Sequence, residues 1–500
     1  MSGRSFLVFL VFTATLLIHV APFLYTLHPF STDVWPLIRV SERLVSEPWV
    51  KIYDDSAFDG YNNRWPGIAL ASAVASLLTG LNVPFVYGIL MAAALSIAMC
   101  TGFYAVARRL GGSVLSTAAM MALPSFTVFT SAALKEVYSY PLMASAALVI
   151  LAGSRLGFLT ALPLLAAAQV VTHHLSTLMT IVIFAEAGVL ELVDAFTRGL
   201  RASGFYRRAI PYSLLTAAMA YTYMEAAGSR IIAEAVDPWD MVTAALYLAL
   251  YTAIYAASRG RPESPAWRGV VSGLLLTAAV APAVWLSWGF YSYDASSIIP
   301  YAAGFILVLS TPRRETVLSN AAAVSAAGVL SFTAFSKPGM GSIAHRVLNY
   351  AAIYLGFTVV KETRTACVIA LAGFIIASGV MAQLLLGMDQ ASFYWVYRDG
   401  DSAAAGFLES FTGDTGVIGD AKLYYMEEMR LRVDTALLLR LLYTGRCPSN
   451  SIIAVSSENV LKGFAEASSV YRLTDTARRL LGETPVVYSS HAYSLYWCPP

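Results

Sequence analysis

The stretch FLVFLVFTATLLIHVAPFLYTL, from Phe6 to Leu27, carries no charged side chain and is long enough to cross a bilayer as one helix. It lacks a clean small-residue cleavage site, so we interpret it as an uncleaved anchor and not as a signal peptide. Similar apolar stretches continue to Gly387. The chain has 57% hydrophobic and 13% charged residues and a mean hydropathy of +0.63. A water-soluble domain of this size would not have this composition, which therefore predicts a multi-pass membrane protein.

About 13 membrane-spanning helices are predicted, because each crossing requires about 20 predominantly apolar residues. They are placed at 6–27, 84–107, 113–133, 137–153, 156–172, 175–195, 209–227, 240–257, 269–289, 298–310, 317–335, 343–360 and 366–387. The expected fold class is an all-α polytopic bundle followed by a small α/β domain. We assign 1–387 to the membrane domain, with a long outer loop at 28–66, and 388–500 to the C-terminal domain.

The distribution of basic residues predicts the orientation in the cell membrane. Alternate gaps between the predicted spans hold about fifteen Lys and Arg in short connections, against about eight in the others, and basic loops stay in the cytoplasm. The N-terminus is therefore expected in the cytoplasm and the C-terminal domain outside it. The shorter Ala/Ser-rich stretch Gly67 to Thr79 is assigned to the outer membrane interface. A formal net charge of +2 gives no indication of a nucleic-acid partner.

The polar tail alternates between two hydrophobic patterns. Helices are predicted at 402–411 and 421–442, and short β-branched strands at 415–418, 451–455 and 485–488, which together indicate an α/β domain.

Two of the four cysteines, Cys447 and Cys498, lie in this outer tail. An oxidising compartment permits a disulfide there, but the sequence gives no distance, so a bridge and two free thiols both remain open. Cys100 and Cys367 fall within predicted spans and are expected to be small buried side chains.

Ionisable residues near the outer ends of the spans are the candidates for a functional site, because such residues are costly in a membrane. Asp33 follows the first span closely. It either caps the helix expected at 34–44 or acts as a general base or metal ligand. Asp55 and Arg64 belong to a cluster of acids, amides and aromatics at 54–66, which is explained either by a solvated loop or by a contribution to the site.

Three further groups lie on the same predicted side. Lys135 and Glu136 occupy a short turn, as an interfacial ion pair or as part of the site. The adjacent His173 and His174 cannot share one helix face, so a zinc pair at helical spacing is not expected, and hydrogen bonds to a phosphate or a sugar suit them better. A last basic group precedes the twelfth span, where it either snorkels to lipid headgroups or binds a phosphate. Its two site candidates are His345 and Arg346.

The chain resembles the C-type (GT-C) membrane glycosyltransferase superfamily, which includes oligosaccharyltransferase catalytic subunits, protein O-mannosyltransferases and aminoarabinose transferases. Within this superfamily, it is expected to belong to an archaeal branch. Besides Asp33 in a long first outer loop, four segments carry the resemblance: Asn63-Arg64-Trp65-Pro66, Ala105 to Gly112, Leu123-Pro124-Ser125-Phe126, and Lys135-Glu136. The acceptor signature of oligosaccharyltransferases is not found in the tail, where Tyr394 to Asp399 is the nearest aromatic and acidic run. The resemblance therefore does not extend to N-glycosylation at sequons.

The resemblance implies transfer of a sugar from a polyprenyl-phosphate donor to a protein or lipid acceptor on the outer face of the membrane. The resemblance implies catalytic roles for Asp33 and Glu136 and binding of the polyprenyl phosphate by Arg346 or Lys135. The polar residues of the outer side supply the remaining candidates: Asp33, Asp55 and Glu136 for a divalent cation, Mg²⁺ or Mn²⁺, and His173, His174, His345 and Arg64 for substrate binding. A multi-pass transporter or lipid flippase is the alternative, although no inverted repeat is visible in the sequence.

Overall fold

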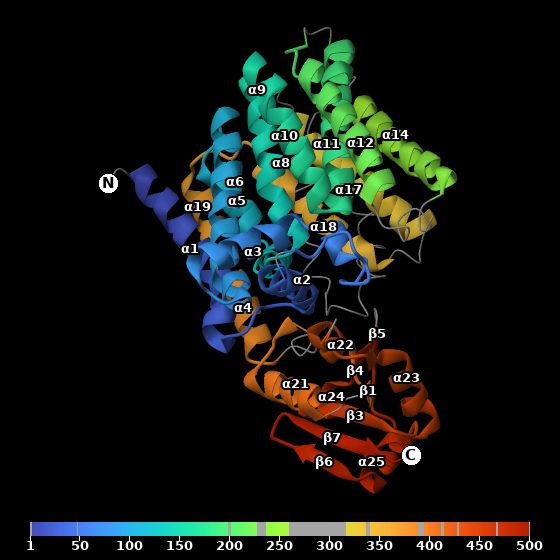
Figure 1. The fold of residues 1–500 in the computed structure, drawn as a ribbon. Coiled ribbons are helices and arrows are strands. Elements are labelled where there is room, and N and C mark those ends of the chain that lie inside the picture. Colours follow the sequence, from blue (N-terminus) through green and yellow to red (C-terminus); the bar gives the residue numbers. More distant parts are fainter. Residues whose placement is uncertain are drawn as a thin grey trace.

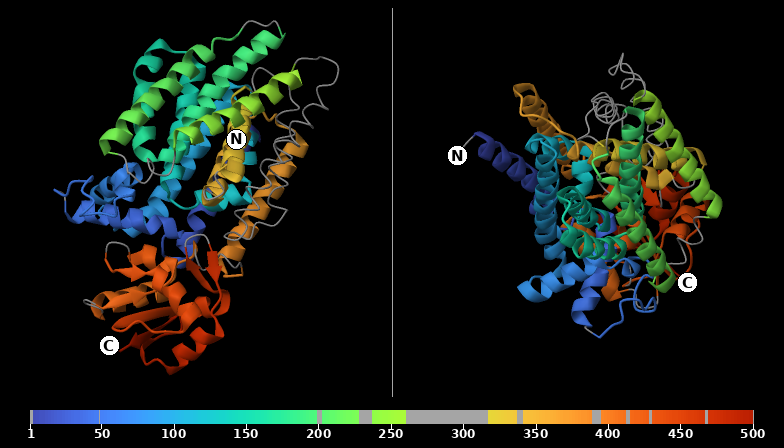
Figure 2. Two further views of the ribbon diagram at one scale, coloured as in Figure 1. Left: turned by 90° about the vertical axis from the view of Figure 1, so that its right-hand side faces the viewer. Right: turned by 90° about the horizontal axis from the view of Figure 1, so that it is seen from above.

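The computed structural model describes residues 3–47, 49–198, 202–227, 237–259, 317–336, 341–388, 395–411, 415–427, 430–466 and 469–499. A body of long helices forms one end of the molecule and a small α/β domain forms the other (Figure 1). The left view in Figure 2, turned by 90° about the vertical axis, shows the same division. The short helices α2 and α3 lie at the end of the helical body that faces the α/β domain (Figure 1).

The helical body begins with the first candidate membrane helix and ends with α19. Its elements are α1 (Gly3–Thr26), η1 (Thr32–Val34), α2 (Trp35–Ser46), η2 (Asn62–Arg64), α3 (Gly67–Thr79), α4 (Val83–Phe85), η3 (Val86–Met91), α5 (Ala92–Arg109), α6 (Val114–Met121), α7 (Pro124–Thr130), α8 (Lys135–Ala152), α9 (Arg155–Leu159), α10 (Ala161–Thr172), α11 (His174–Arg198), α12 (Tyr206–Ala227), α14 (Pro238–Arg259), α17 (Val317–Ser331), η5 (Phe332–Ser336), α18 (Gly341–Gly356) and α19 (Arg364–Leu385).

Six helical stretches in the described part of the chain are long and apolar enough to cross a membrane. A seventh crossing results if α7 and α8, which meet at an angle of 107°, count as one broken span. The chain is thus mostly helical with several candidate spans, as predicted, whereas the number of thirteen remains a prediction. Two of the predicted spans, 269–289 and 298–310, lie outside the described residues.

The predicted continuous span at 113–133 is wrong. The structure divides it into α6 and α7, because Pro124 has no backbone N–H to continue the first helix and disfavours helical geometry at Leu123. Leu123 is extended, with φ −75° and ψ 117°, and Pro124 occupies the first turn of α7. The bend leads the chain directly to Lys135 and Glu136 at the start of α8.

Small residues hold the helices of the body close together. In α17 every residue from Leu318 to Ser331 is buried, and most of them are Ala, Ser, Gly or Val. Gly102 of α5 faces Ala144 of α8 so closely that a Cβ at position 102 would lie 2.9 Å from the Ala144 Cβ. Such close approach strengthens van der Waals contact in an environment where lipid removes most of the hydrophobic driving force.

The α/β domain is built on a five-stranded mixed sheet of order β2-β1-β3-β7-β6. Strand β1 runs parallel to β2 and β3, and β7 runs antiparallel to β3 and β6. Its elements are α21 (Asp399–Phe411), β1 (Gly416–Ile418), α22 (Ala421–Glu427), β2 (Val433–Asp434), α23 (Thr435–Thr444), β3 (Ser451–Ser456), α24 (Ser457–Lys462), β4 (Phe464–Glu466), β5 (Ser469–Tyr471), α25 (Asp475–Glu483), β6 (Val486–Ser489) and β7 (Tyr493–Cys498).

The central strand β3 is buried along its whole length. Ile453 and Val455 belong to one core cluster and Ile452 and Ala454 to another, as the two-residue period of a strand requires. The strand predictions at 415–418, 451–455 and 485–488 are confirmed within a residue or two, and so is the helix at 402–411. The single helix predicted at 421–442 is wrong, because β2 pairs with β1 inside that range and separates α22 from α23.

Cys447 and Cys498 form a disulfide, with their Cα atoms 5.8 Å apart. The bridge connects the loop before β3 to the end of β7, where Cys498 is fully buried. The sequence did not distinguish a bridge from two free thiols. The structure shows the bridge.

Replacing Cys498 with Ser is expected to lower the free energy of unfolding of the α/β domain by about 2–5 kcal/mol, because the bridge closes a long loop and so restricts the unfolded chain. Thermal unfolding of the purified protein in detergent measures the change. Cys367→Ser, which removes a thiol outside the bridge, is the matched control and should leave the transition unchanged. A normal melting profile for Cys498→Ser would contradict the expected contribution.

Candidate functional site

Asp33 lies in the one-turn helix η1 between α1 and α2, at the end of the helical body that faces the α/β domain. The preceding Ser31 has a left-handed backbone, with φ +82°, and its N–H donates to the carbonyl oxygen of Trp395 at 2.8 Å. The N-cap residue of α2 is Val34, and no side chain caps that helix. Helix capping therefore does not explain Asp33.

The carboxylate of Asp33 instead pairs with Arg346 of α18. The Arg346 Nη2 atom donates to Asp33 Oδ2 at 2.8 Å, across 313 positions of sequence. Both side chains are partly exposed, at 34% for Asp33 and 27% for Arg346. A partly exposed pair contributes about 0–1 kcal/mol of stability, so its separation is inexpensive.

Glu136, in the first turn of α8, is buried to 2% exposure. Neither of its carboxylate oxygens has a hydrogen-bond partner. The nearest ion-pair partner is His173, whose Nδ1 lies 3.9 Å from Glu136 Oε1. The charges of Arg346, Asp33 and Lys135 also act on this carboxylate. Burying a carboxylate without hydrogen bonds costs free energy. Glu136 is therefore a candidate for hydrogen bonding to a bound molecule.

His173 interrupts the helical chain between α10 and α11, where its extended backbone has φ −166° and ψ 132°. Its Nδ1 is 3.0 Å from Ser176 Oγ, and the Ser176 hydroxyl contacts the Tyr350 hydroxyl in turn. The Nε2 atom of His173 has no partner. One turn earlier, the amide of buried Gln169 also lacks partners for both of its polar atoms. We call Glu136 and His173 the unsatisfied cluster.

Lys135 does not form the exposed ion pair that its neighbour Glu136 suggests in the sequence. The amine is buried and donates to Asn62 Oδ1 at 2.8 Å. It also lies 4.1 Å from the ring centre of Tyr61 and 5.8 Å from that of Trp65, as in cation–π contacts. The Trp65 ring packs on His174 with centroids 4.8 Å apart.

The Tyr61 hydroxyl shows how closely these charges gather. Burial raises the pKa of Tyr61 to about 12, the positive charge of Arg346 opposes the increase, and the charges of Glu136, Asp33 and Asp59 add to it. Side chains from the outer loop, α8 and α18 thus act on one atom. The structure brings together Asp33, Lys135, Glu136, His173, His174 and Arg346, and the side chain of His345 lies outside the described residues.

Arg64 and Asp55 have a different arrangement. Arg64 donates to both Asp55 oxygens, at 3.0 and 2.5 Å, and to the carbonyl oxygen of Ala227 at 3.0 Å. Asn63 donates to Asp55 as well, at 3.1 Å. These bonds close the outer loop on itself, so they explain both side chains without a substrate.

A divalent cation has little to bind here. Within the described ranges, no group of three His, Cys, Asp or Glu side chains is placed to hold a metal ion. Asp55 is already engaged by Arg64. The three acids expected as ligands do not form one donor set, and we derive no step through a metal.

Acidification is expected to open the Arg64–Asp55 contact. Hydrogen bonds from Arg64 hold the pKa of Asp55 below its usual value. A lowered folded-state pKa adds stability that is complete above the unfolded pKa of about 3.9 and disappears as the pH falls through the folded value. The hydrogen-exchange protection factors of residues 49–66, which are corrected for the intrinsic pH dependence of exchange, should therefore be unchanged from pH 7 to 5 and lower near pH 3. Asp55→Asn should show the lower protection already at pH 7, and undiminished protection in this variant would contradict the assignment.

Sequence reasoning missed several residues of the site. Tyr61 and Trp65 belong to the cluster at 54–66 but were given no role in the site, and Asn62, Gln169 and Tyr350 were not singled out. The signal for Gln169 was its position one helical turn before His173. Nothing in the sequence predicts that Tyr350 reaches Ser176.

No protein-family model matches the chain, and no curated protein matches it in sequence. Among solved structures, it is similar to the oligosaccharyltransferase of Archaeoglobus fulgidus tethered through a disulfide bond to an acceptor peptide containing the NVT sequon. The TM-score is 0.40 with 13% sequence identity, over 91% of this chain and 70% of that chain. A similarity this distant carries no argument about chemistry.

Proposed function

We propose that this protein is a membrane glycosyltransferase that moves a sugar from a polyprenyl-phosphate donor to a hydroxyl group of a protein or lipid acceptor. The observation that carries the proposal is the unsatisfied cluster, which lies within electrostatic range of the Asp33–Arg346 pair. Buried polar atoms without partners are costly beside apolar helices, and the polar headgroup of a lipid-linked substrate would satisfy them.

Each part of such a donor has a chemical counterpart in the site. The phosphate suits the guanidinium of Arg346, which offers paired N–H donors. Sugar hydroxyls both donate and accept hydrogen bonds, so they suit the Glu136 carboxylate and the Nε2 atom of His173. The apolar chain of the donor would remain in lipid beside the helical body.

In the proposed reaction, Asp33 accepts the proton of the acceptor while the acceptor atom forms a bond to the anomeric carbon. The bond from that carbon to the phosphate oxygen breaks, and its electron pair leaves with the phosphate, which Arg346 stabilises. Asp33 and Arg346 pair with each other in the absence of substrate. Binding of the phosphate to Arg346 would therefore release Asp33 to act as the base.

Reconstitution of the purified protein in liposomes with a radiolabelled polyprenyl-phosphate sugar tests the proposal. Transfer of label to a protein or lipid acceptor, with release of polyprenyl phosphate, is the expected result. Movement of the intact labelled lipid between leaflets without cleavage would instead support the alternative of a flippase. Absence of both product and donor binding, with several sugars tried, would overturn the proposed function.

A further inference from the structure

A second polar site lies between the helical body and the α/β domain. It is a cavity of about 560 Å³, bounded by the ends of α1 and α2, by α4, and by α21 and α22. One wall is apolar and includes Phe23, Leu27 and Phe85. Phe23 is near the end of one candidate membrane span and Phe85 is near the start of another. The apolar wall is thus at the boundary depth where lipid headgroups lie.

This cavity is separate from the site around Asp33. Trp35, Arg39 and Glu42 line it, and their spacing of four and three residues places them on one face of α2. That face contacts the α/β domain, because Arg39 donates twice to the carbonyl oxygen of Met426, at 3.0 and 2.6 Å. Asp33 pairs with Arg346 of the helical body instead. The two sites therefore use different side chains.

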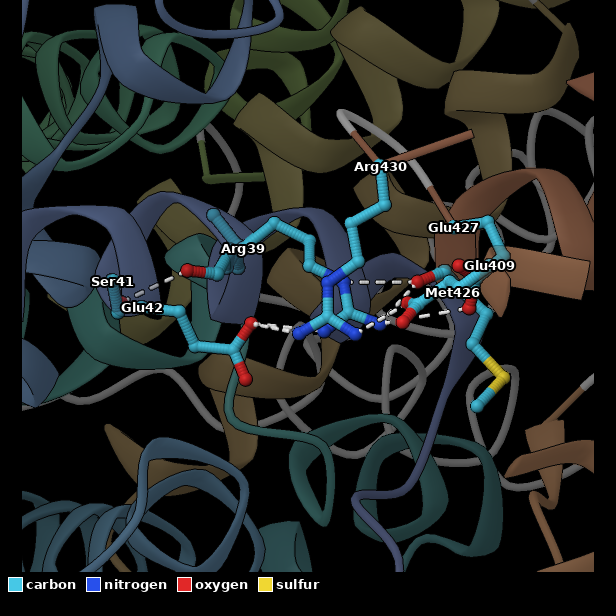
Figure 3. Close-up of polar contacts among 8 residues, drawn as sticks. Arg39, Ser41, Glu42, Glu409, Met426, Glu427 and Arg430 are labelled. Carbon is cyan, nitrogen blue, oxygen red and sulfur yellow. Dashed lines mark hydrogen bonds and ion pairs between the residues drawn. The ribbon is translucent and has the colours of Figure 1, made fainter. Parts of the chain in front are cut away.

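Three carboxylates and two guanidinium groups also line the cavity (Figure 3). Glu42 accepts from Arg39 at 2.8 Å and from Arg430 at 3.1 Å, and Arg430 donates to Glu409 at 2.7 Å. The fifth charged group, Glu427, forms only a long ion pair with Arg39, at 3.8 Å. Three carboxylates therefore share two guanidinium groups, which leaves an excess of carboxylate acceptors.

Two buried groups of the cavity are unsatisfied. Both oxygens of Glu427, which is fully buried, lack a hydrogen-bond partner, and the closest guanidinium nitrogen of Arg39 is 3.8 Å away. The indole N–H of buried Trp35 also has no acceptor. A ligand that satisfies both must donate hydrogen bonds to a carboxylate and accept one from an N–H group.

We propose that this cavity binds a lipid whose headgroup combines a primary ammonium with a phosphate. The ammonium donates to Glu427 and its neighbouring carboxylates, a phosphate oxygen accepts from Trp35, and the acyl chains lie against the apolar wall. A quaternary ammonium has no N–H to donate, and a glycerol headgroup brings no positive charge, so neither matches the excess of acceptors. The proposal concerns binding alone and does not depend on the proposed transfer reaction.

Protonation of Glu427 should weaken this binding. Burial raises the pKa of Glu427 to about 7, and the positive charge of Arg39 opposes the increase. The other charged groups around it are Glu409 of α21, Glu42 of α2 and Arg430, while His28, which also lines the cavity, pairs with Asp399. An ammonium favours the ionised carboxylate. Affinity is therefore expected to rise as the pH increases through about 7.

The test is native mass spectrometry of the full-length protein in detergent, titrated with phosphoethanolamine, phosphocholine and phosphoglycerol lipids of identical chains. The phosphoethanolamine lipid is expected to bind about tenfold or more tightly than the others, because it alone supplies charge-assisted N–H donors. Free phosphoethanolamine without chains should bind far more weakly. Equal binding of the three lipids would overturn the proposed headgroup, and equal binding of the free compound would overturn the lipid assignment.

Two variants and a control complete the experiment. Glu427→Gln should remove the preference for phosphoethanolamine, whereas Glu483→Gln, an exposed glutamate of α25 outside the cavity, should retain it. Ala405 is buried and lines the cavity, so Ala405→Leu should fill the space and reduce binding of the lipid without altering any charge. Undiminished phosphoethanolamine binding in Ala405→Leu would overturn the cavity as the binding site, even if Glu427→Gln fails to fold.

Discussion

Asp33→Asn is expected to reduce sugar transfer by about 10²–10⁴-fold, because the amide cannot accept the proton of the acceptor as a carboxylate does. The variant should fold normally, since the ion pair that it removes is partly exposed. Its amide oxygen can still accept a hydrogen bond from Arg346. Initial rates of label transfer in proteoliposomes, together with thermal unfolding in detergent, measure both effects.

The matched control is Asp54→Asn, which changes an exposed carboxylate of the same outer loop that accepts hydrogen bonds from Ser56. It should transfer sugar at the rate of the unchanged protein. Binding of polyprenyl phosphate should become tighter in Asp33→Asn, because the phosphate no longer has to break the ion pair between Asp33 and Arg346. Unchanged turnover in Asp33→Asn would remove this residue from the mechanism, and weaker phosphate binding would contradict the proposed role of the pair.

Glu136→Gln is expected to change activity and stability in opposite directions. The substitution keeps the shape of the side chain but removes a buried charge that has no hydrogen-bond partner. The free energy of unfolding should therefore rise by about 1–3 kcal/mol. Transfer should fall by about 10²-fold or more, because a neutral amide loses the electrostatic contribution of the carboxylate.

Glu186→Gln in α11 provides the comparison. Glu186 is also a buried membrane glutamate, but it accepts a hydrogen bond from Thr252 at 2.6 Å. Its replacement should leave transfer unchanged. A purely structural role for Glu136 would give a less stable protein with normal turnover after correction for the folded fraction, and that result would contradict the proposed site.

Several parts of the site were predictable because each depended on local sequence. Ionisable residues next to membrane spans are rare, so they can be selected as candidates from the sequence. Asp33 follows an apolar span, and His173 and His174 lie in a break between two spans. The sequence did not show that these residues lie close together, because that depends on how the whole chain folds. Arg346 reaches Asp33 across 313 positions, and Glu136 lies at the start of α8, directly after the 107° bend between α7 and α8, with its carboxylate 3.9 Å from His173.

The roles of Asp55 and Arg64 could not be assigned from their sequence. An acidic and a basic residue nine positions apart in a polar loop can bind each other or a substrate, and composition does not distinguish the two. In the structure they bind each other, and the same bonds explain why the loop is closed. The cavity between the helical body and the α/β domain was not predictable either, because the segments that line it are nearly 400 residues apart in the sequence.

The sequence by itself determined that the chain is a mostly helical protein with several candidate membrane spans, and it located most of the strands and one of the helices predicted in the tail. Hydropathy and side-chain period are properties of short segments, so they can be read without coordinates. Only the tertiary structure decided which charges meet, that Cys447 bonds to Cys498, and that the carboxylates of Glu136 and Glu427 have no hydrogen-bond partners. Those facts depend on distances between remote segments, which the packing of the whole chain determines.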